Sequence, residues 1–86
     1  MLAYVGLASH PAQVQSVFAD RVALVSDFSY GLRSTTAIEL VNDARTFKCI
    51  LSMRVIRVQA HAGFGYIVEG DFTRQLTAEE LRSLRS

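Results

Sequence analysis

The longest apolar stretch of the chain, residues 46–59, has the period of a β-strand rather than that of a helix. Every second residue from position 47 to position 55 is apolar, and these residues share one face: Phe47, Cys49, Leu51, Met53 and Val55. Because successive side chains of a strand point to opposite faces, this alternation predicts a long strand. Ile50, Ile56 and Val58 lie on its other face, so we expect both faces to be partly covered. At about 3.3 Å per residue, a straight strand of this length would outrun a small barrel. We therefore expect a bend or bulge near Ser52.

Three more segments have the composition of strands, and turn signals separate them. Residues 21–28 are rich in β-branched side chains and end at a turn signal over residues 29–31. Residues 35–41 are closed by an Asn-Asp pair, which favours a turn. Residues 66–72 follow the glycine-bearing sequence 61–65, which predicts a hairpin with the long strand.

Residues 1–20 contain no Lys or Arg and admit two interpretations. A Ser-His pair before Pro11 is typical of a helix start, because proline is tolerated in the first turn. Apolar residues between Val14 and Phe18 then repeat at helical spacing. A strand over residues 14–25 fits nearly as well. We favour a short helical turn that leads into a strand.

The C-terminal sequence carries the clearest signal, a helix that begins after Thr77. Thr77 and Glu80 form a capping box, in which each side chain bonds the backbone N–H of the other residue. Leu76, before the cap, is placed to pack on Leu81. The helix then buries one stripe and exposes another: Leu81 and Leu84 inward, Arg82 and Arg85 outward near the C-terminal end of the dipole. The strands and this helix predict a mainly β fold, a small antiparallel β-barrel with one C-terminal helix.

Composition agrees with a single domain over residues 1–86. Half of the residues are apolar, only 20% are charged, and the formal net charge is +1, which excludes a polyelectrolyte and disfavours disorder. One cysteine excludes an internal disulfide and a thiolate zinc site. No apolar run reaches about 18 residues and the N-terminus lacks a positive region, so we expect a cytoplasmic protein. The predicted core consists of Val22, Leu24, Phe28, Leu40, Phe47, Cys49, Leu51, Val55, Ile67, Phe72, Leu76, Leu81 and Leu84.

The reactive side chains form no catalytic or metal-binding pattern. The two histidines, His10 and His61, are far apart in the sequence, and Cys49 lies on an apolar face, where an inert buried thiol is expected. Glu69 and Asp71 share a strand face, but acid–base catalysis also needs a cleft, which this turn-rich sequence does not indicate. We therefore expect a protein that is not an enzyme and that holds no metal or cofactor.

Residues 27–33, with the sequence DFSYGLR, are the strongest candidate for a ligand contact. Asp27 and Ser29 stand two apart and project to one side of an extended chain, and Gly31 lets a ligand approach the backbone. Such a group can hydrogen-bond a purine edge or a ribose hydroxyl, and Arg33 can add a guanidinium. The same residues also suit an ordinary turn between two strands, which needs no ligand.

Arg54 and Arg57 place two more guanidiniums, which suit phosphates, in the long strand. Positions three apart on a regular strand face opposite sides, so these two form one clamp only if a bulge intervenes. A solvated face is the simpler interpretation. A net charge of +1 gives little drive for binding nucleic acid, which we rank last among the partners.

The order of segments from residue 21 to residue 86 resembles that of a known family. A strand over 53–59, a glycine hairpin, a strand over 66–72 that ends in Phe, and the sequence LTAEELRSL at 76–84 follow one another. PilZ domains commonly close in this way, and the Asp, Ser and Gly of residues 27–31 resemble the family's ligand motif. That family is a small bacterial β-barrel with a C-terminal helix that senses cyclic di-GMP. The resemblance therefore implies a nucleotide-binding signalling module with ligand contacts at Asp27, Ser29 and Gly31.

Three departures from the PilZ pattern bear on the ligand. The family motif runs Asp/Asn-x-Ser-x-x-Gly, and Gly31 comes one residue early. No arginine precedes Arg21, so the family's N-terminal R-x-x-x-R pair, which grips the phosphates and guanines, is absent. Glu69 stands where the family often has Gly. These departures imply that cyclic di-GMP binds weakly or not at all.

Two functions of different classes remain open. The first is a non-enzymatic, PilZ-like signalling module. The alternative is a degenerate barrel that binds a protein partner or a second copy of itself, because a spare apolar patch tends to seek a partner. The side chains that would supply this patch are Tyr4, Val5, Leu7, Val14, Val17 and Phe18. The simpler explanation is that this segment covers one open end of the barrel.

Overall fold

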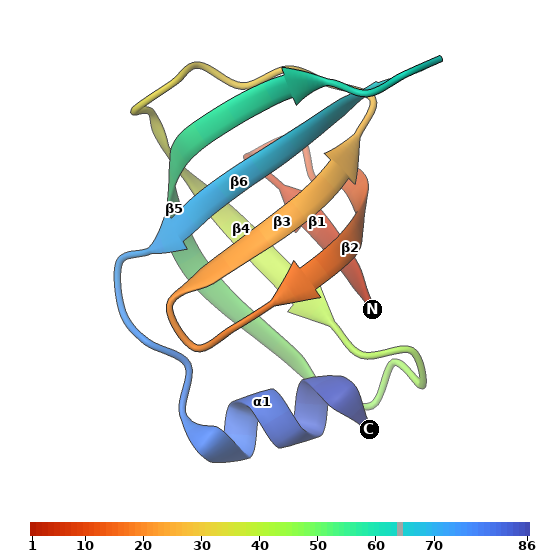
Figure 1. Ribbon diagram of the computed structural model, residues 1–86. Helices are drawn as coiled ribbons and strands as arrows, with labels where there is room; N and C mark the ends of the chain where they lie inside the picture. Colours follow the sequence, from red (N-terminus) through yellow and green to blue (C-terminus); the bar gives the residue numbers. More distant parts are fainter. Residues whose placement is uncertain (64) are drawn as a thin grey trace.

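Six antiparallel strands close into a barrel, and one short helix lies across one of its ends (Figure 1). The computed structural model describes residues 1–63 and 65–86. In chain order the elements are β1 (Leu2–Val5), β2 (His10–Val17), β3 (Arg21–Ser26), β4 (Thr35–Val41), β5 (Lys48–Ala60), β6 (Tyr66–Phe72) and α1 (Ala78–Arg85). Around the barrel the order is β1-β2-β3-β6-β5-β4, and β4 pairs back with β1. The predicted fold class is confirmed; Phe64, in the predicted hairpin, lies outside the described residues.

The alternating face of β5 fills the barrel as the sequence predicts. Its inward side chains pack with those of the other strands and of the helix into one core. Nine residues of the predicted core are buried: Val22, Leu24, Leu40, Cys49, Leu51, Val55, Phe72, Leu76 and Leu84. Phe47 and Leu81 are half-buried against this core.

Phe28 and Ile67 were placed in the core wrongly. Strand β3 ends at Ser26, two residues earlier than predicted, so Phe28 lies in the following loop. Its side chain is 45% exposed, and its ring centroid lies 3.8 Å from that of His10. Ile67 is only half-buried because the inward positions of β6 are its alternate residues, beginning with Val68.

The helical turn predicted near Pro11 is wrong, because residues 2–17 form the hairpin of β1 and β2. Its turn is made by Gly6 and Ser9, both with positive φ, at 76° and 52°. Glycine adopts this conformation without a steric cost, so Gly6 sets the reversal of the chain.

A β-bulge explains why β2 has the spacing of a helix. The register with β3 shifts between Val14 and Ser16, which leaves Gln15 as the extra residue. The next inward side chain, Val17, therefore comes three residues after Val14 instead of two. A strand with a bulge thus imitates the period on which the helical interpretation rested.

The bulge that the sequence predicts in β5 exists, but four residues beyond the predicted position. Ser52 lies in a regular ladder opposite Ala37 of β4. The register with β6 shifts instead between Val55 and Arg57. The ladder between β4 and β5 ends nearby, at Arg54, so β5 bends where it is no longer held on that side.

Helix α1 covers one end of the barrel (Figure 1), and its N-terminus has the predicted capping box. The Glu80 amide donates to the Thr77 hydroxyl at 3.1 Å, and the Thr77 amide donates to the Glu80 carboxylate at 2.9 Å. Leu84 is buried against the barrel. Arg85, predicted to point outward, is exposed but donates to the carbonyl oxygen of Val17 at 2.9 Å. The helix is thus fastened to the barrel at both of its ends.

The opposite end of the barrel is formed by the loops over residues 6–9 and 27–34, together with residues 61–63 and 65 between β5 and β6 (Figure 1). Gly65 packs on the end of β3, because a Cβ added there would lie only 2.7 Å from the carbonyl oxygen of Ser26. Within the described residues, no helix is long and apolar enough to cross a membrane.

Candidate functional site

All four residues of the predicted ligand site lie together on one loop, residues 27–34, which joins β3 to β4. Asp27, Ser29, Gly31 and Arg33 are all exposed. The loop stands at the end of the barrel opposite α1, so neither the helix nor its fastening contacts cover it (Figure 1). The structure therefore leaves these side chains open to solvent along one loop, which crosses the end of the barrel from β3 to β4 (Figure 1).

Backbone hydrogen bonds hold this loop in one shape. The Phe28 amide donates to the Ser26 hydroxyl at 3.1 Å, which fixes the exit from β3. The Arg33 amide donates to the carbonyl oxygen of Val55 at 2.7 Å, and the Val55 amide donates to the carbonyl oxygen of Ser34 at 2.9 Å. These two bonds attach the end of the loop to β5, beside the bulge.

Gly31 has no conformational reason to be glycine. Its φ is outside the positive range that favours glycine, and a Cβ added there would meet only Ser34 atoms, at 3.8 Å and beyond. Gly31 is the first residue of a turn in which the Ser34 amide donates to its carbonyl oxygen at 3.1 Å. The strained position of that turn is Arg33, with a φ of 67°. The turn alone therefore does not explain this glycine.

Asp27 borders a shallow groove of about 320 Å³ on the outer face of β1, β2 and β3. The rest of the lining is mostly apolar and includes Leu2, Pro11 and Val25. A carboxylate at the edge of an apolar surface suits a flat ligand that offers N–H donors at one side, such as a purine.

Arg54 and Arg57 both face outward, which a regular strand would not allow. Both side chains are exposed, while Val55 between them is buried. The bulge after Val55 inserts one residue and so returns Arg57 to the face that Arg54 occupies. The condition under which the sequence predicted one clamp is therefore met.

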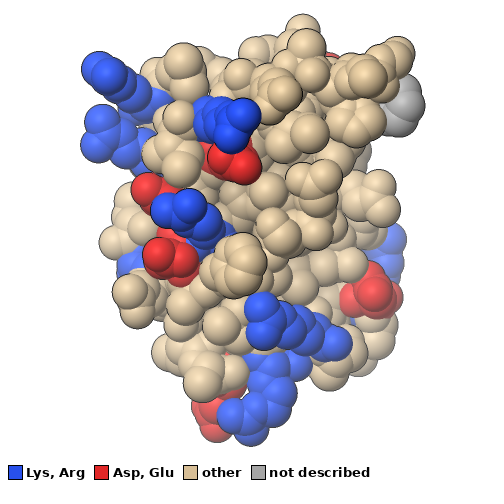
Figure 2. Space-filling model, viewed as in Figure 1, with Lys and Arg blue, Asp and Glu red and all other residues tan. Residues whose placement is uncertain are grey.

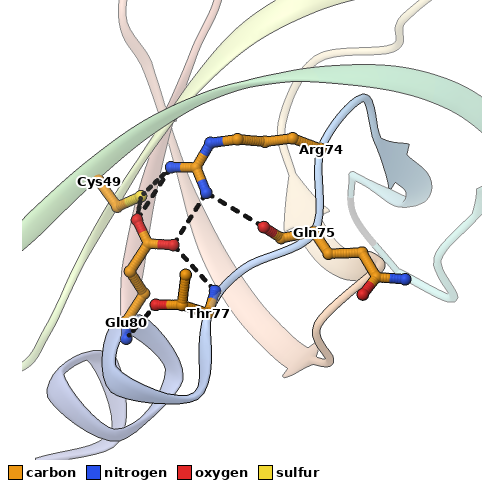
Figure 3. Close-up of polar contacts among 5 residues, drawn as sticks. All are labelled: Cys49, Arg74, Gln75, Thr77 and Glu80. Atoms are coloured by element: carbon orange, nitrogen blue, oxygen red, sulfur yellow. Dashed lines mark hydrogen bonds and ion pairs between the residues drawn. The ribbon is translucent and has the colours of Figure 1, made fainter.

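A polar cluster that the sequence did not predict joins α1 to the barrel (Figure 3). Arg74 pairs with both carboxylate oxygens of Glu80, at 2.8 and 2.9 Å. The Cys49 thiol donates to Glu80 at 3.1 Å and accepts from Arg74 at 3.4 Å. The capping box points to Glu80, but Arg74 and Cys49 are 6 and 31 residues away from it along the chain, and the packing of the segment after β6 against β5 brings Cys49 to it.

The charge states of Cys49, Arg74 and Glu80 fit a structural contact between helix and barrel. Hydrogen bonds from Arg74, and then from the Thr77 amide, hold the pKa of the Glu80 carboxyl well below its ordinary value. Burial, and then the neighbouring Glu80, raise the pKa of the Cys49 thiol. A neutral thiol beside a permanent ion pair is a poor nucleophile, and the structural interpretation of Cys49 stands.

The low pKa of Glu80 predicts a specific loss of stability in acid. A carboxyl whose pKa is depressed by folding stabilises the protein fully above its ordinary value of 4.5, and this contribution shrinks as the pH falls through and below that value. The free energy of unfolding of Glu80→Gln, measured in urea, should therefore fall below that of the unsubstituted protein at pH 7, and the difference should shrink progressively as the pH falls from 4.5 toward the depressed pKa of Glu80. Glu79→Gln is the matched control, because Glu79 is exposed in the same turn; an equal pH dependence of both variants would contradict the assignment.

Among the residues that the structure describes, no three His, Cys, Asp or Glu side chains gather into a metal-binding group. No family model matches the sequence, and the searches of curated proteins and of solved structures return no similar protein. What the site does is therefore to be inferred from its own residues.

Proposed function

We propose that this barrel is a non-enzymatic, PilZ-like signalling module of the cytoplasm that binds cyclic di-GMP weakly through the loop 27–34. The observation that carries the proposal is the exposed loop itself, on which Asp27, Ser29 and Gly31 stand together at the open end of the barrel. The unexplained glycine supports it, because a position with free space and ordinary φ gains from lacking a Cβ only if something approaches the backbone there.

The affinity should be low because the family's N-terminal arginine pair has no counterpart here. Residues 2–17 form β1 and β2, and this segment contains no arginine. A hydrogen bond to a charged group contributes about 1.5–3 kcal/mol. Two missing bonds of this kind weaken binding by roughly two to four orders of magnitude.

Titration calorimetry with cyclic di-GMP, at about 150 mM salt and high micromolar protein, tests the proposal. We expect saturable heat with a dissociation constant in the high micromolar range, and loss of that heat in Asp27→Ala. Asp20→Ala is the matched control, because Asp20 is an exposed aspartate beyond the other end of β3. Silence of the unsubstituted protein up to millimolar ligand, or an equal loss in both variants, would contradict the proposal.

A protein-interaction module is the second candidate, and exposed apolar side chains at the open end favour it. Of the N-terminal residues expected to seek a partner, Val5 and Val17 are buried within the barrel. Leu7 remains fully exposed on the loop 6–9, and Phe28 and Leu32 are exposed on the loop 27–34 at the same end of the barrel (Figure 1). Light scattering separates the two candidates, since a monomer at tens of micromolar would exclude the self-associating form.

A further inference from the structure

The bulge in β5 gathers basic side chains beside the candidate loop. Arg54, Ile56 and Arg57 are exposed on the outside of the barrel, and only Val55 points inward. Arg54 and Arg57 lie opposite Asp71 and Glu69, which are two residues apart on β6, so at about 3.3 Å per residue the two arginine backbones are roughly 7 Å apart along the strand. Two long side chains at this spacing can converge on one phosphate or bind two neighbouring ones.

Arg33 brings a third guanidinium to the same place. Its amide donates to the carbonyl oxygen of Val55, the residue that follows Arg54 in β5. Its side chain is exposed. In Figure 2, basic side chains gather at the upper left of the view, where Figure 1 shows β5 and the loop 27–34.

The nearby carboxylates leave this group of arginines with excess positive charge. On β6, Glu69 lies opposite Arg57 and Asp71 lies opposite Arg54. Asp71 is also shared with Arg21 of β3, whose Nε lies 3.7 Å from it. Four arginines thus surround two carboxylates on this face.

The guanidiniums of the group are available to a ligand. Within the described residues, no carboxylate lies within 4.0 Å of the guanidinium of Arg33, Arg54 or Arg57. Arg57 bonds only a neutral partner, the Gln59 side chain, at 3.1 Å. A guanidinium without a carboxylate partner keeps its paired donors free for the oxygens of a phosphate.

We infer that Arg54 and Arg57, with Arg33, form an anion site for the phosphodiester groups of a cyclic dinucleotide, built on the bulge of β5. The inference rests on the proposed function, since the loop 27–34 would contact the same ligand beside it. This site offers phosphate contacts from the barrel wall that replace only part of what the family's N-terminal pair would contribute, in keeping with weak binding. Ile56, 40% exposed between the two arginines, offers an apolar contact that an organic phosphodiester can use and a free phosphate cannot. A small ligand fits better than a nucleic acid strand, because three arginines release few counterions.

The test combines calorimetry with NMR of the arginine Nε–Hε groups. In Arg54→Ala/Arg57→Ala, we expect cyclic di-GMP to bind at least about tenfold more weakly than in the unsubstituted protein. The matched control is Arg45→Ala/Arg82→Ala, which also removes two exposed arginines, both outside this group, and should bind within about twofold of the unsubstituted protein. Amide spectra of both double variants show whether the barrel is intact. Pyrophosphate, added alone, should shift the Nε–Hε signals of Arg54 and Arg57 more than those of Arg45 and Arg82.

The outcomes separate this inference from the proposed function. If Asp27→Ala abolishes the binding of cyclic di-GMP while Arg54→Ala/Arg57→Ala leaves it intact, only the anion site is overturned. Pyrophosphate shifts at Arg54 and Arg57 in a protein that ignores cyclic di-GMP would support the anion site and contradict the proposed function. Equal pyrophosphate shifts at all four arginines, or tighter binding of a single-stranded oligonucleotide than of cyclic di-GMP, would overturn the inference.

Discussion

Gly70→Ala should destabilise the protein by about 2–3 kcal/mol, a large effect for the addition of one methyl group. Gly70 lies on β6 between Val22 of β3 and Val55 of β5 and points into the barrel. A Cβ at this position would overlap the Cγ and Sδ atoms of Met53, which is fully buried, and would lie 3.2 Å from the carbonyl oxygen of Arg54. A tightly packed interior has no room into which Met53 can withdraw.

Urea denaturation and thermal unfolding measure this effect, and Gly31→Ala is the matched control. The unfolding midpoint of Gly70→Ala should fall by roughly 10–20 °C. Gly31 has open space and ordinary φ, so Gly31→Ala should change the free energy of unfolding by less than about 0.5 kcal/mol. Met53 is the side chain that the new Cβ would overlap. The loss of unfolding free energy in Gly70→Ala/Met53→Ala should therefore be smaller than the sum of the losses in the two single variants, by about 1 kcal/mol or more. Equal stability of the two glycine variants would show that Met53 can move aside for a Cβ at Gly70.

Leu84→Ala should cost about 2–4 kcal/mol and release α1 from the end of the barrel. Leu84 is 1% exposed and is the one fully buried side chain of the helix. The cavity left by truncation lies between the helix and the barrel, where a short helix cannot collapse without losing its other contacts. Arg82→Ala, an exposed change on the same helix, should stay within about 0.5 kcal/mol of the unsubstituted protein.

Thiol labelling of Cys49 distinguishes release of the helix from general loss of stability. The Cys49 thiol is buried and bonded to Glu80 of α1, so it should react slowly while the helix is docked. In Leu84→Ala labelling should accelerate at urea concentrations too low to unfold the barrel, as expected for a local opening. Labelling that accelerates only together with global unfolding would mean that helix and barrel form one cooperative unit.

The parts of the fold that the sequence predicts are those whose signals are local. Strand β6 and the capping box of Thr77 and Glu80 are defined by neighbours in the chain, and both are confirmed. The β1–β2 hairpin was missed because the bulge at Gln15 replaces a spacing of two by a spacing of three. Periodicity alone cannot separate a bulged strand from a helical turn over so few residues.

The candidate site divides in the same way. The four residues of the loop 27–34 stay together because they are contiguous in the sequence, and any strand–loop–strand arrangement would keep them so. Whether Arg54 and Arg57 share a face depends on one inserted residue, whose position is set by where β5 leaves β4. The contact of Cys49 with Arg74 and Glu80 depends on tertiary packing, which joins residues 25 and 31 positions apart in the chain.

Closure of the barrel also restricts how this protein can be recognised. Each strand pairs with a neighbour on both sides along part of its length, but β5 beyond Val55 pairs with β6 alone and β2 beyond Val14 pairs with β3 alone. Recognition by β-augmentation, a frequent way for small β domains to capture extended peptides, is therefore restricted to such short strand ends. Along the rest of the barrel wall a partner must bind side chains and loop backbone. Short edges that follow a bulge also disfavour the edge-to-edge growth that leads to cross-β aggregates.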